Sequence, residues 1–134
     1  MQPQFTELSQ IDSGAVQQAS HWQQRYAAIL SLAKQVKEKP QLRQAAYQLP
    51  GCSAKLWLDT HADQGRIWFC IDSESRILKG VFALILQQWQ GKSASTIKTF
   101  QPDEFFQQLG LESHLSPSRS NGIKQAIKSV QASL

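Results

Sequence analysis

Two short runs of aliphatic and aromatic residues constrain the fold of this chain more than any other feature. They span residues 54–60 (AKLWLDT) and 66–71 (RIWFCI), and residues 61–65, which end in glycine, separate them. Runs of this length, joined by a short glycine-containing segment, are typical of a β-hairpin. The rest of the chain has mainly helical patterns, so we expect one small antiparallel sheet with residues 61–65 as its loop.

A long amphipathic helix is expected before the hairpin. Ser20 and Gln23 have the spacing of a capping box, with Ser20 as the N-cap, and apolar residues then recur at helical intervals. The residue before a proline avoids helical backbone angles, so Pro40 limits the helix to about residues 21–37.

Further helices are expected after the hairpin. The segment 72–75 (DSES) supplies capping groups for a strongly apolar helix, which Gly91 ends. Other helices are predicted near 93–99, from Pro102 to Leu109, and from Ser116 to near the end of the chain. We therefore predict a single domain over residues 1–134 with an α+β fold: a small antiparallel sheet (the hairpin at about 54–71) with helices packed on one side.

The composition is that of a globular protein, with 41% hydrophobic and 18% charged residues. The first ten residues lack the basic cluster and apolar run of a secretion signal. The longest apolar stretch, residues 81–86, is too short to cross a bilayer. We therefore expect a cytoplasmic protein that does not enter a membrane.

The net charge of +4 comes from basic residues that are scattered along the chain. No arginine-rich block or basic–aromatic motif accompanies them, so nucleic-acid binding is not expected. A moderately positive face could still dock an acidic protein partner.

The two cysteines occupy different predicted environments. Cys52 follows Pro50 and Gly51 in a loop, where another molecule can reach its thiol, whereas Cys70 lies inside the second strand. A hairpin centred on residues 61–65 places Cys70 opposite Leu56 and Cys52 opposite Glu74, so no disulfide between the cysteines is expected. Two thiols alone do not make a metal site, and none is predicted.

Three other side chains are candidates for a role near Cys52. Arg119 lies in the first turn of the last helix, where a cation opposes the helix dipole, so it is expected either to pair with a carboxylate such as Asp72 or to stabilise a thiolate. His114 could act as a base if it approached Cys52. Trp57 is expected to be a core or edge aromatic.

Four segments resemble motifs of one known family. Residues 51–58 (GCSAKLWL) are similar to a G-C-x-x-x-V-W segment, and residues 72–80 (DSESRILKG) to a D-S-x-x-x-I-[VL]-[KR]-G helix entry. Residues 115–122 (LSPSRSNG) look like an L-[ST]-x-S-R-S-x-G ending, and residues 22–26 (WQQRY) are similar to W-x-x-[KR]-Y. Their order and spacing over about residues 20–130 resemble the SufE/CsdE family of sulfur acceptors, somewhat closer to its CsdE branch.

The resemblance implies a fold similar to IscU-type iron–sulfur scaffolds and a role in sulfur transfer. Cys52 would accept sulfane sulfur as a persulfide from a cysteine desulfurase and stimulate that enzyme, with Gly51, Trp57, Asp72 and Arg119 in support. The pyridoxal phosphate would belong to the desulfurase, and this chain would hold no cofactor. The protein would be a carrier and activator, not an autonomous enzyme, and would pass sulfur to an iron–sulfur scaffold or another acceptor as a monomer or weak homodimer.

Two alternatives stay open from the sequence. An iron–sulfur scaffold would need three or four thiolate or imidazole ligands. A cysteine-dependent hydrolase would need a base within hydrogen-bond reach of Cys52.

Overall fold

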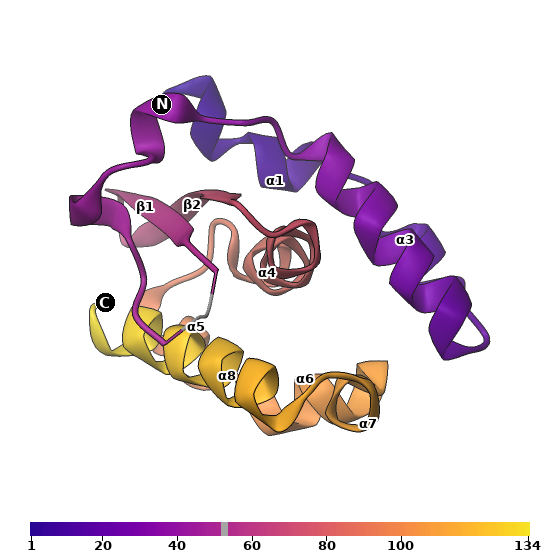
Figure 1. The fold of residues 1–134 in the computed structure, drawn as a ribbon. Coiled ribbons are helices and arrows are strands. Elements are labelled where there is room, and N and C mark those ends of the chain that lie inside the picture. Colours follow the sequence, from indigo (N-terminus) through magenta and orange to yellow (C-terminus); the bar gives the residue numbers. More distant parts are fainter. Residues whose placement is uncertain (52–53) are drawn as a thin grey trace.

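The fold of this protein is built around one apolar helix, α4, which lies between two groups of helices and beside the hairpin (Figure 1). The computed structural model describes residues 1–51 and 54–134. In chain order the elements are η1 (Pro3–Phe5), α1 (Glu7–Gln10), α2 (Gly14–Gln18), α3 (Trp22–Gln35), η2 (Pro40–Leu42), η3 (Ala45–Tyr47), β1 (Leu56–Asp63), β2 (Arg66–Ser73), α4 (Arg76–Trp89), α5 (Ala94–Lys98), α6 (Pro102–Leu109), α7 (Leu111–His114) and α8 (Pro117–Ala132).

The hairpin is longer, and its turn tighter, than the sequence predicts. β1 and β2 pair antiparallel through a turn of Gln64 and Gly65, which have φ values of 51° and 76°. Two successive residues at positive φ are typical of the type I′ turn, whose twist matches that of paired strands. The expected five-residue loop is therefore wrong, because residues 61–63 continue β1.

The tighter turn shifts the predicted register by three residues. Cys70 lies opposite Asp59, and Leu56 lies opposite Ser73, so the predicted pairing of Cys70 with Leu56 is wrong. The predicted partner of Glu74, Cys52, lies outside the described residues; the amide of Glu74 donates to the carbonyl of Lys55 (3.1 Å).

The helix α3 begins one residue later than predicted. Its N-cap is His21, whose Nδ1 accepts a hydrogen bond from the amide of Gln24 (3.3 Å). The Gln24 side chain in turn accepts from the amide and hydroxyl of Ser20. The reciprocal capping box expected of Ser20 and Gln23 is therefore wrong: His21 caps the amide of Gln24, and the Gln24 side chain bonds Ser20.

The helix α4 is buried along nearly its whole length, as its sequence predicts. Ser75 is the N-cap and accepts a hydrogen bond from the amide of Leu78 (3.3 Å). Gly80 allows the close crossing of α3, because a Cβ atom there would lie 2.6 Å from the carbonyl oxygen of Ile29. Gly91, at φ 70°, follows the end of the helix.

The two faces of the sheet contact different parts of the chain. Leu56, Leu58 and Ile71 join the main core with α3, α4 and α8. Trp57 and Cys70, on the opposite face, pack with Phe5 and Leu42 in a smaller cluster. The α+β fold and the small antiparallel sheet are confirmed, and the N-terminal segment covers the face that the main helices leave open.

Candidate functional site

The segment 49–56, which contains Cys52 in the sequence, is closed at its base by backbone pairing. The amide of Leu49 donates to the carbonyl of Leu56 (2.9 Å), and Gln48 forms an antiparallel bridge with Trp57. Cys52 lies outside the described residues, so its surroundings are defined here by the two arms that flank it. Both arms start from the edge of the sheet.

The first arm ends at Gly51, which packs against the last helix. Gly51 has a φ of 95°, and a Cβ atom there would lie 3.0 Å from Oε1 and 3.2 Å from Cβ of Gln125 in α8. A side chain would be strained by the backbone angle and crowded by the helix. Glycine is therefore the residue that lets the chain approach α8 directly before Cys52.

The second arm is attached to the turn between β2 and α4. The carbonyl of Lys55 accepts hydrogen bonds from the Ser73 hydroxyl (2.7 Å) and the Glu74 amide (3.1 Å). The Ser73 hydroxyl also accepts from the amide of Ser75 (3.1 Å), the N-cap of α4. The position of Lys55 is thereby coupled to the start of the central helix.

Asp72 is fully buried next to this turn and is surrounded by donors. It accepts hydrogen bonds from the amides of Lys39 (2.8 Å) and Ser73 (2.9 Å) and from Nε of Arg43 (2.9 Å), with Nζ of Lys79 3.8 Å away. Burial by itself would raise the pKa of Asp72, but these hydrogen bonds outweigh it and hold that pKa below its ordinary value. The carboxylate is therefore charged and structural.

Arg43 also connects Asp72 to Trp57. Its guanidinium carbon lies 5.0 Å from the centre of the Trp57 ring, and Trp57 is the register partner of Asp72. Trp57 is therefore a core aromatic with a cation on its face, as one of the sequence expectations had it. The sequence reasoning missed Arg43, which carries no motif and lies 29 positions from Asp72.

Arg119 does not form the suggested pair with Asp72, whose cationic neighbours are Arg43 and Lys79. It lies in the first turn of α8, half-buried, and its amide donates to the N-cap Ser116 (3.2 Å). Within residues 1–51 and 54–134 its guanidinium has no carboxylate at ion-pair distance. The expectation that it stabilises a thiolate is left as a proposal.

His114 contacts a different part of the molecule from the arms of the loop. Its ring stacks on Trp22 at the start of α3, with 4.5 Å between ring centroids and 4° between planes. The arms contact α8 at Gln125 and the β2–α4 turn. The described contacts therefore give His114 a packing role.

Cys70 is an inert thiol. It is fully buried between the sheet and the N-terminal segment, and burial raises its pKa to about 12. A thiol with that pKa is almost entirely protonated at neutral pH, and the thiolate is the nucleophilic form. Core packing, as the sequence predicts, accounts for Cys70.

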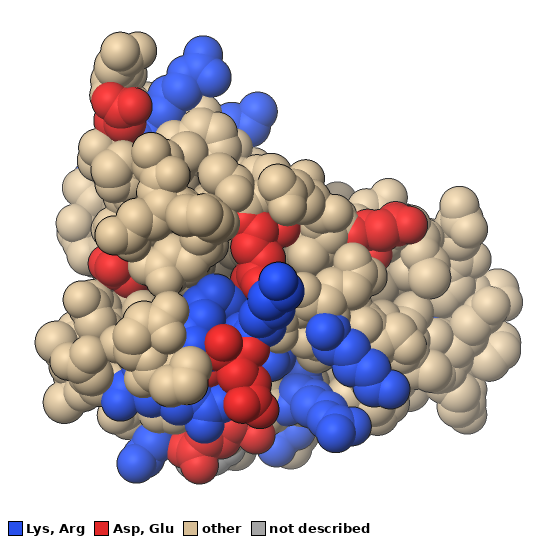
Figure 2. Space-filling view, turned by 90° about the horizontal axis from the view of Figure 1, so that it is seen from above, with Lys and Arg blue, Asp and Glu red and all other residues tan. Residues whose placement is uncertain are grey.

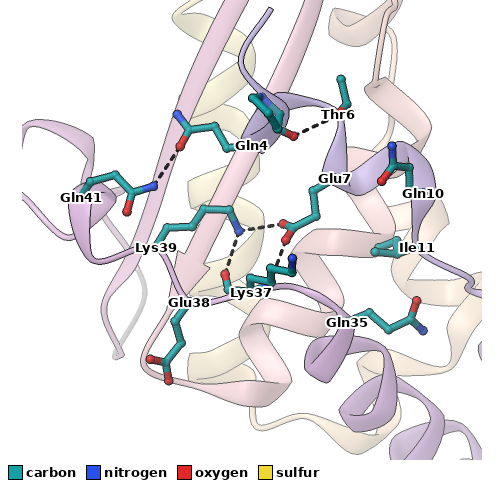
Figure 3. Close-up of a pocket in the computed structure, with 11 residues that line it drawn as sticks. Gln4, Thr6, Glu7, Gln10, Ile11, Gln35, Lys37, Glu38, Lys39 and Gln41 are labelled. Carbon is teal, nitrogen blue, oxygen red and sulfur yellow. Dashed lines mark hydrogen bonds and ion pairs between the residues drawn. The ribbon is translucent and has the colours of Figure 1, made fainter.

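A polar hollow of about 540 Å³ lies between the N-terminal segment and residues 35–41 (Figure 3). Nζ of Lys39, nearly buried, donates to Oε1 of Glu7 (2.7 Å) and to the carbonyls of Lys37 (2.8 Å) and Ile71 (3.1 Å). A Gln41–Gln4 hydrogen bond also joins the two segments (3.0 Å). The Nζ atom of Lys39 and the carboxylate of Glu7 are engaged with each other and with the main chain, so we assign this region a structural role.

The described residues offer two negative findings. They contain no group of three or more His, Cys, Asp or Glu side chains that could hold a metal ion. Among the helices they form, none has the length and apolar character needed to cross a bilayer.

Comparison with known proteins defines the class. The family model for SufE, the Fe-S metabolism associated domain, matches residues 13–134, so this chain belongs to the SufE family. The sulfur acceptor protein CsdE of Escherichia coli is 34% identical over 84% of this chain and 78% of its own length. An uncharacterised SufE-like protein of Haemophilus influenzae is 33% identical, over 82% and 89% of the two chains.

The fold also has a counterpart among solved structures. The solution structure of a hypothetical protein from Thermus thermophilus superimposes with a TM-score of 0.68 and covers 95% of this chain and 92% of its own. The sequences are 18% identical, so this likeness concerns the fold.

Proposed function

We propose that this protein is a sulfur acceptor in iron–sulfur metabolism that takes sulfane sulfur from a cysteine desulfurase as a persulfide on Cys52 and stimulates that enzyme. Membership of the SufE family and the similarity to a sulfur acceptor protein support the general role. The structural observation that supports the assignment to Cys52 is the pair of flanking arms, which are paired at their base and contact α8 on one side and the β2–α4 turn on the other.

The proposed step is a thiol–persulfide exchange. The Cys52 thiolate attacks the terminal sulfur of the donor persulfide, the sulfur–sulfur bond of the donor breaks, and the donor cysteine leaves as a thiolate. One sulfur atom and its proton move to Cys52, and no external oxidant or reductant is needed. The carbon–sulfur bond of the substrate is cleaved by the desulfurase with its own pyridoxal phosphate, so this chain is a carrier and activator.

Gly51, Trp57, Asp72 and Arg119 have separate proposed parts. Gly51 brings the loop onto α8, while Trp57 and Asp72 hold the base of the loop through Arg43. An ordinary cysteine has a pKa of about 8.5, so few thiolates exist at neutral pH. We propose that the positive charge of Arg119 favours the thiolate form of Cys52. The variant Arg119→Gln should then raise the pH at which sulfur loading is half-maximal, without a change in the thermal midpoint of unfolding.

Intact mass spectrometry tests the assignment. After incubation with a cysteine desulfurase, pyridoxal phosphate and L-cysteine, the wild type is expected to gain one sulfur, about 32 Da. Cys70→Ser should gain the same mass and Cys52→Ser should gain none. Loading on Cys70 would refute the assignment.

The remaining parts of the proposal follow from the same role. The downstream partner would be an iron–sulfur scaffold or another sulfur acceptor, the compartment the cytoplasm, and the protein a monomer or weak homodimer. A cluster scaffold and a cysteine hydrolase gain no specific support: the described residues hold no set of three candidate ligands, and His114 stacks on Trp22.

A further inference from the structure

A hollow lined by cations lies between the end of α3 and the start of α4. Its volume is about 260 Å³, and its charged lining consists of Lys34, Lys37, Arg76 and Lys79 with the single acid Glu38. We call this cavity, with the four cations that line it, the basic hollow. Figure 2 shows Lys and Arg side chains gathered in the lower half of one face of the molecule, with a few acidic ones between them.

Three cations of the basic hollow carry charge that the described part of the chain does not neutralise. Lys34, Lys37 and Arg76 are exposed and have no ion pair with a described carboxylate. Lys79 is mostly buried and lies 3.8 Å from Asp72, which Arg43 also contacts. The hollow therefore has an excess of positive charge that faces solvent.

The position of two of these cations opposes the stability of α4. Arg76 is the first residue of the helix and Lys79 the fourth, and there is no acid in its first turn. The amino end of a helix carries partial positive charge, so cations there are unfavourable. The ion pair with the buried Asp72 accounts for Lys79, whereas Arg76 has no ion pair with a described carboxylate, and recognition of an anionic surface would account for its position.

The backbone under the basic hollow is fixed. The amide of Lys37 donates to Oε2 of Glu7 (3.0 Å), and the carbonyl of Lys37 accepts from Nζ of Lys39 (2.8 Å), as Figure 3 shows. These bonds hold the main chain of Lys37, whose side chain is exposed. The main chain at Lys37 therefore needs no ordering when a partner docks.

The basic hollow is also adjacent to the candidate loop. Glu74 lies two residues before Arg76, and its amide donates to the carbonyl of Lys55, three residues after Cys52. The start of α4, which lines the hollow through Arg76, is therefore connected to the second arm through the β2–α4 turn.

We infer that the basic hollow docks an acidic surface of the protein that donates sulfur to Cys52, an inference that rests on the proposed function. Exposed charges at the edge of a protein–protein interface mainly raise the association rate and select the partner. A protein is favoured over RNA because nearby Glu38 and Glu74, whose charges act on Arg43, interrupt the positive surface, whereas a nucleic-acid site is an uninterrupted basic stripe.

A pair of charge-reversed double variants tests this inference. Lys34→Glu with Arg76→Glu alters the hollow, and Lys92→Glu with Lys98→Glu makes the same change of net charge at exposed sites elsewhere, Lys92 lying at the hairpin-turn end of β2. Sulfur loading of Cys52 is measured by quenched-flow mass spectrometry with limiting desulfurase at about 0.05 and 0.5 M salt. Inorganic polysulfide serves in parallel as a small sulfane donor that needs no docking.

The hollow variant is expected to load about tenfold more slowly than wild type from the desulfurase at low salt, with the difference disappearing at high salt. It should load normally from polysulfide, and its thermal midpoint should change little, because Arg76→Glu is favourable at the start of α4 and Lys34→Glu is unfavourable in the last turn of α3. Equal rates for the two double variants would overturn the inference. So would a hollow variant that loads normally but has lost binding to bulk RNA.

Failure of the proposed function gives a different result. Wild type that gains no sulfur from either donor would refute persulfide formation itself, and the docking inference with it. Lost docking gives another pattern. Every variant then loads normally from polysulfide, and the hollow variant alone loads slowly from the desulfurase.

Discussion

Nε of Arg43 donates a 2.9 Å hydrogen bond to Oδ2 of Asp72, a carboxylate with no solvent exposure. The same guanidinium lies over the ring of Trp57, two residues from the arm that leads to Cys52. This contact joins the segment after η2 to both strands of the hairpin. It therefore holds the base of the candidate loop.

Removing the charge of Asp72 should destabilise the fold. Asp72→Asn weakens the bond to Arg43 and leaves buried donors imperfectly paired, so we expect a loss of about 2 kcal/mol in the free energy of unfolding. Urea denaturation measures it. The matched control is Asp103→Asn, which removes an exposed carboxylate that pairs with Lys124 and should cost much less than Asp72→Asn. Equal costs would contradict the role given to Asp72.

The contribution of Asp72 should depend on pH. Its pKa is lowered in the folded protein, so its stabilisation is complete above the unfolded-state pKa of about 3.9 and is lost as the pH falls through the folded pKa. The difference in unfolding free energy between wild type and Asp72→Asn should be constant from about pH 5 to 8 and shrink below about pH 4. Urea titrations across this range provide the measurement. A difference that grows toward acid pH would have the wrong sign.

Cys70 should be unreactive until the protein unfolds. Because burial raises its pKa to about 12, the folded Cys52→Ser variant should gain no iodoacetamide adduct at pH 8. The same variant in urea should gain one adduct, counted by intact mass. Rapid alkylation of the folded variant would show that the small cluster around Cys70 opens.

Gly51→Ala should be more costly than an equally strained substitution in open space. Gly51 and Gly65 both have positive φ, but a Cβ atom at Gly51 meets Gln125, whereas one at Gly65 has no neighbour within 4 Å. Gly65→Ala should therefore show the backbone strain alone, about 1 kcal/mol, and Gly51→Ala should exceed it. Thermal unfolding of both variants gives the comparison, and sulfur loading should slow in Gly51→Ala only.

Gly80→Ala should be among the most damaging small substitutions. The added methyl group would meet the backbone carbonyl of Ile29 at 2.6 Å, and a backbone atom cannot move aside as a side chain tip can. Overpacking of this kind costs about 1–3 kcal/mol. Gly14→Ala, where the nearest atom is a side-chain oxygen of Asp12 at 3.1 Å, is the control, and urea midpoints report both.

Much of the secondary structure could be predicted because its signals are local. Ser75 and Ser116 cap the helices that they were expected to cap, and Pro102 and Gly110 bound α6. Each of these signals depends on bonds within about four residues, and so a reader of the sequence has all the partners in view. The apolar run after Ser75 likewise indicated a buried helix.

The hairpin register could not be predicted in the same way. It depended on whether Gln64 would adopt a positive φ beside Gly65, a conformation that non-glycine residues take rarely. The tight turn is favoured because it extends β1 by three residues and matches the strand twist. The shift replaced Leu56 with Asp59 as the neighbour of Cys70.

The sequence by itself determined the family motifs, the order and type of most helices, and the place of Cys52 in the chain directly after Pro50 and Gly51. The tertiary structure decided which distant residues come together: Arg43 pairs with Asp72, Gly51 packs against Gln125, and Lys34 and Arg76 line one hollow. The physical reason is the separation along the chain of the residues that interact. Caps and turns are formed by neighbours in the chain, whereas buried charges and close backbone contacts are selected by packing between segments that are tens of residues apart.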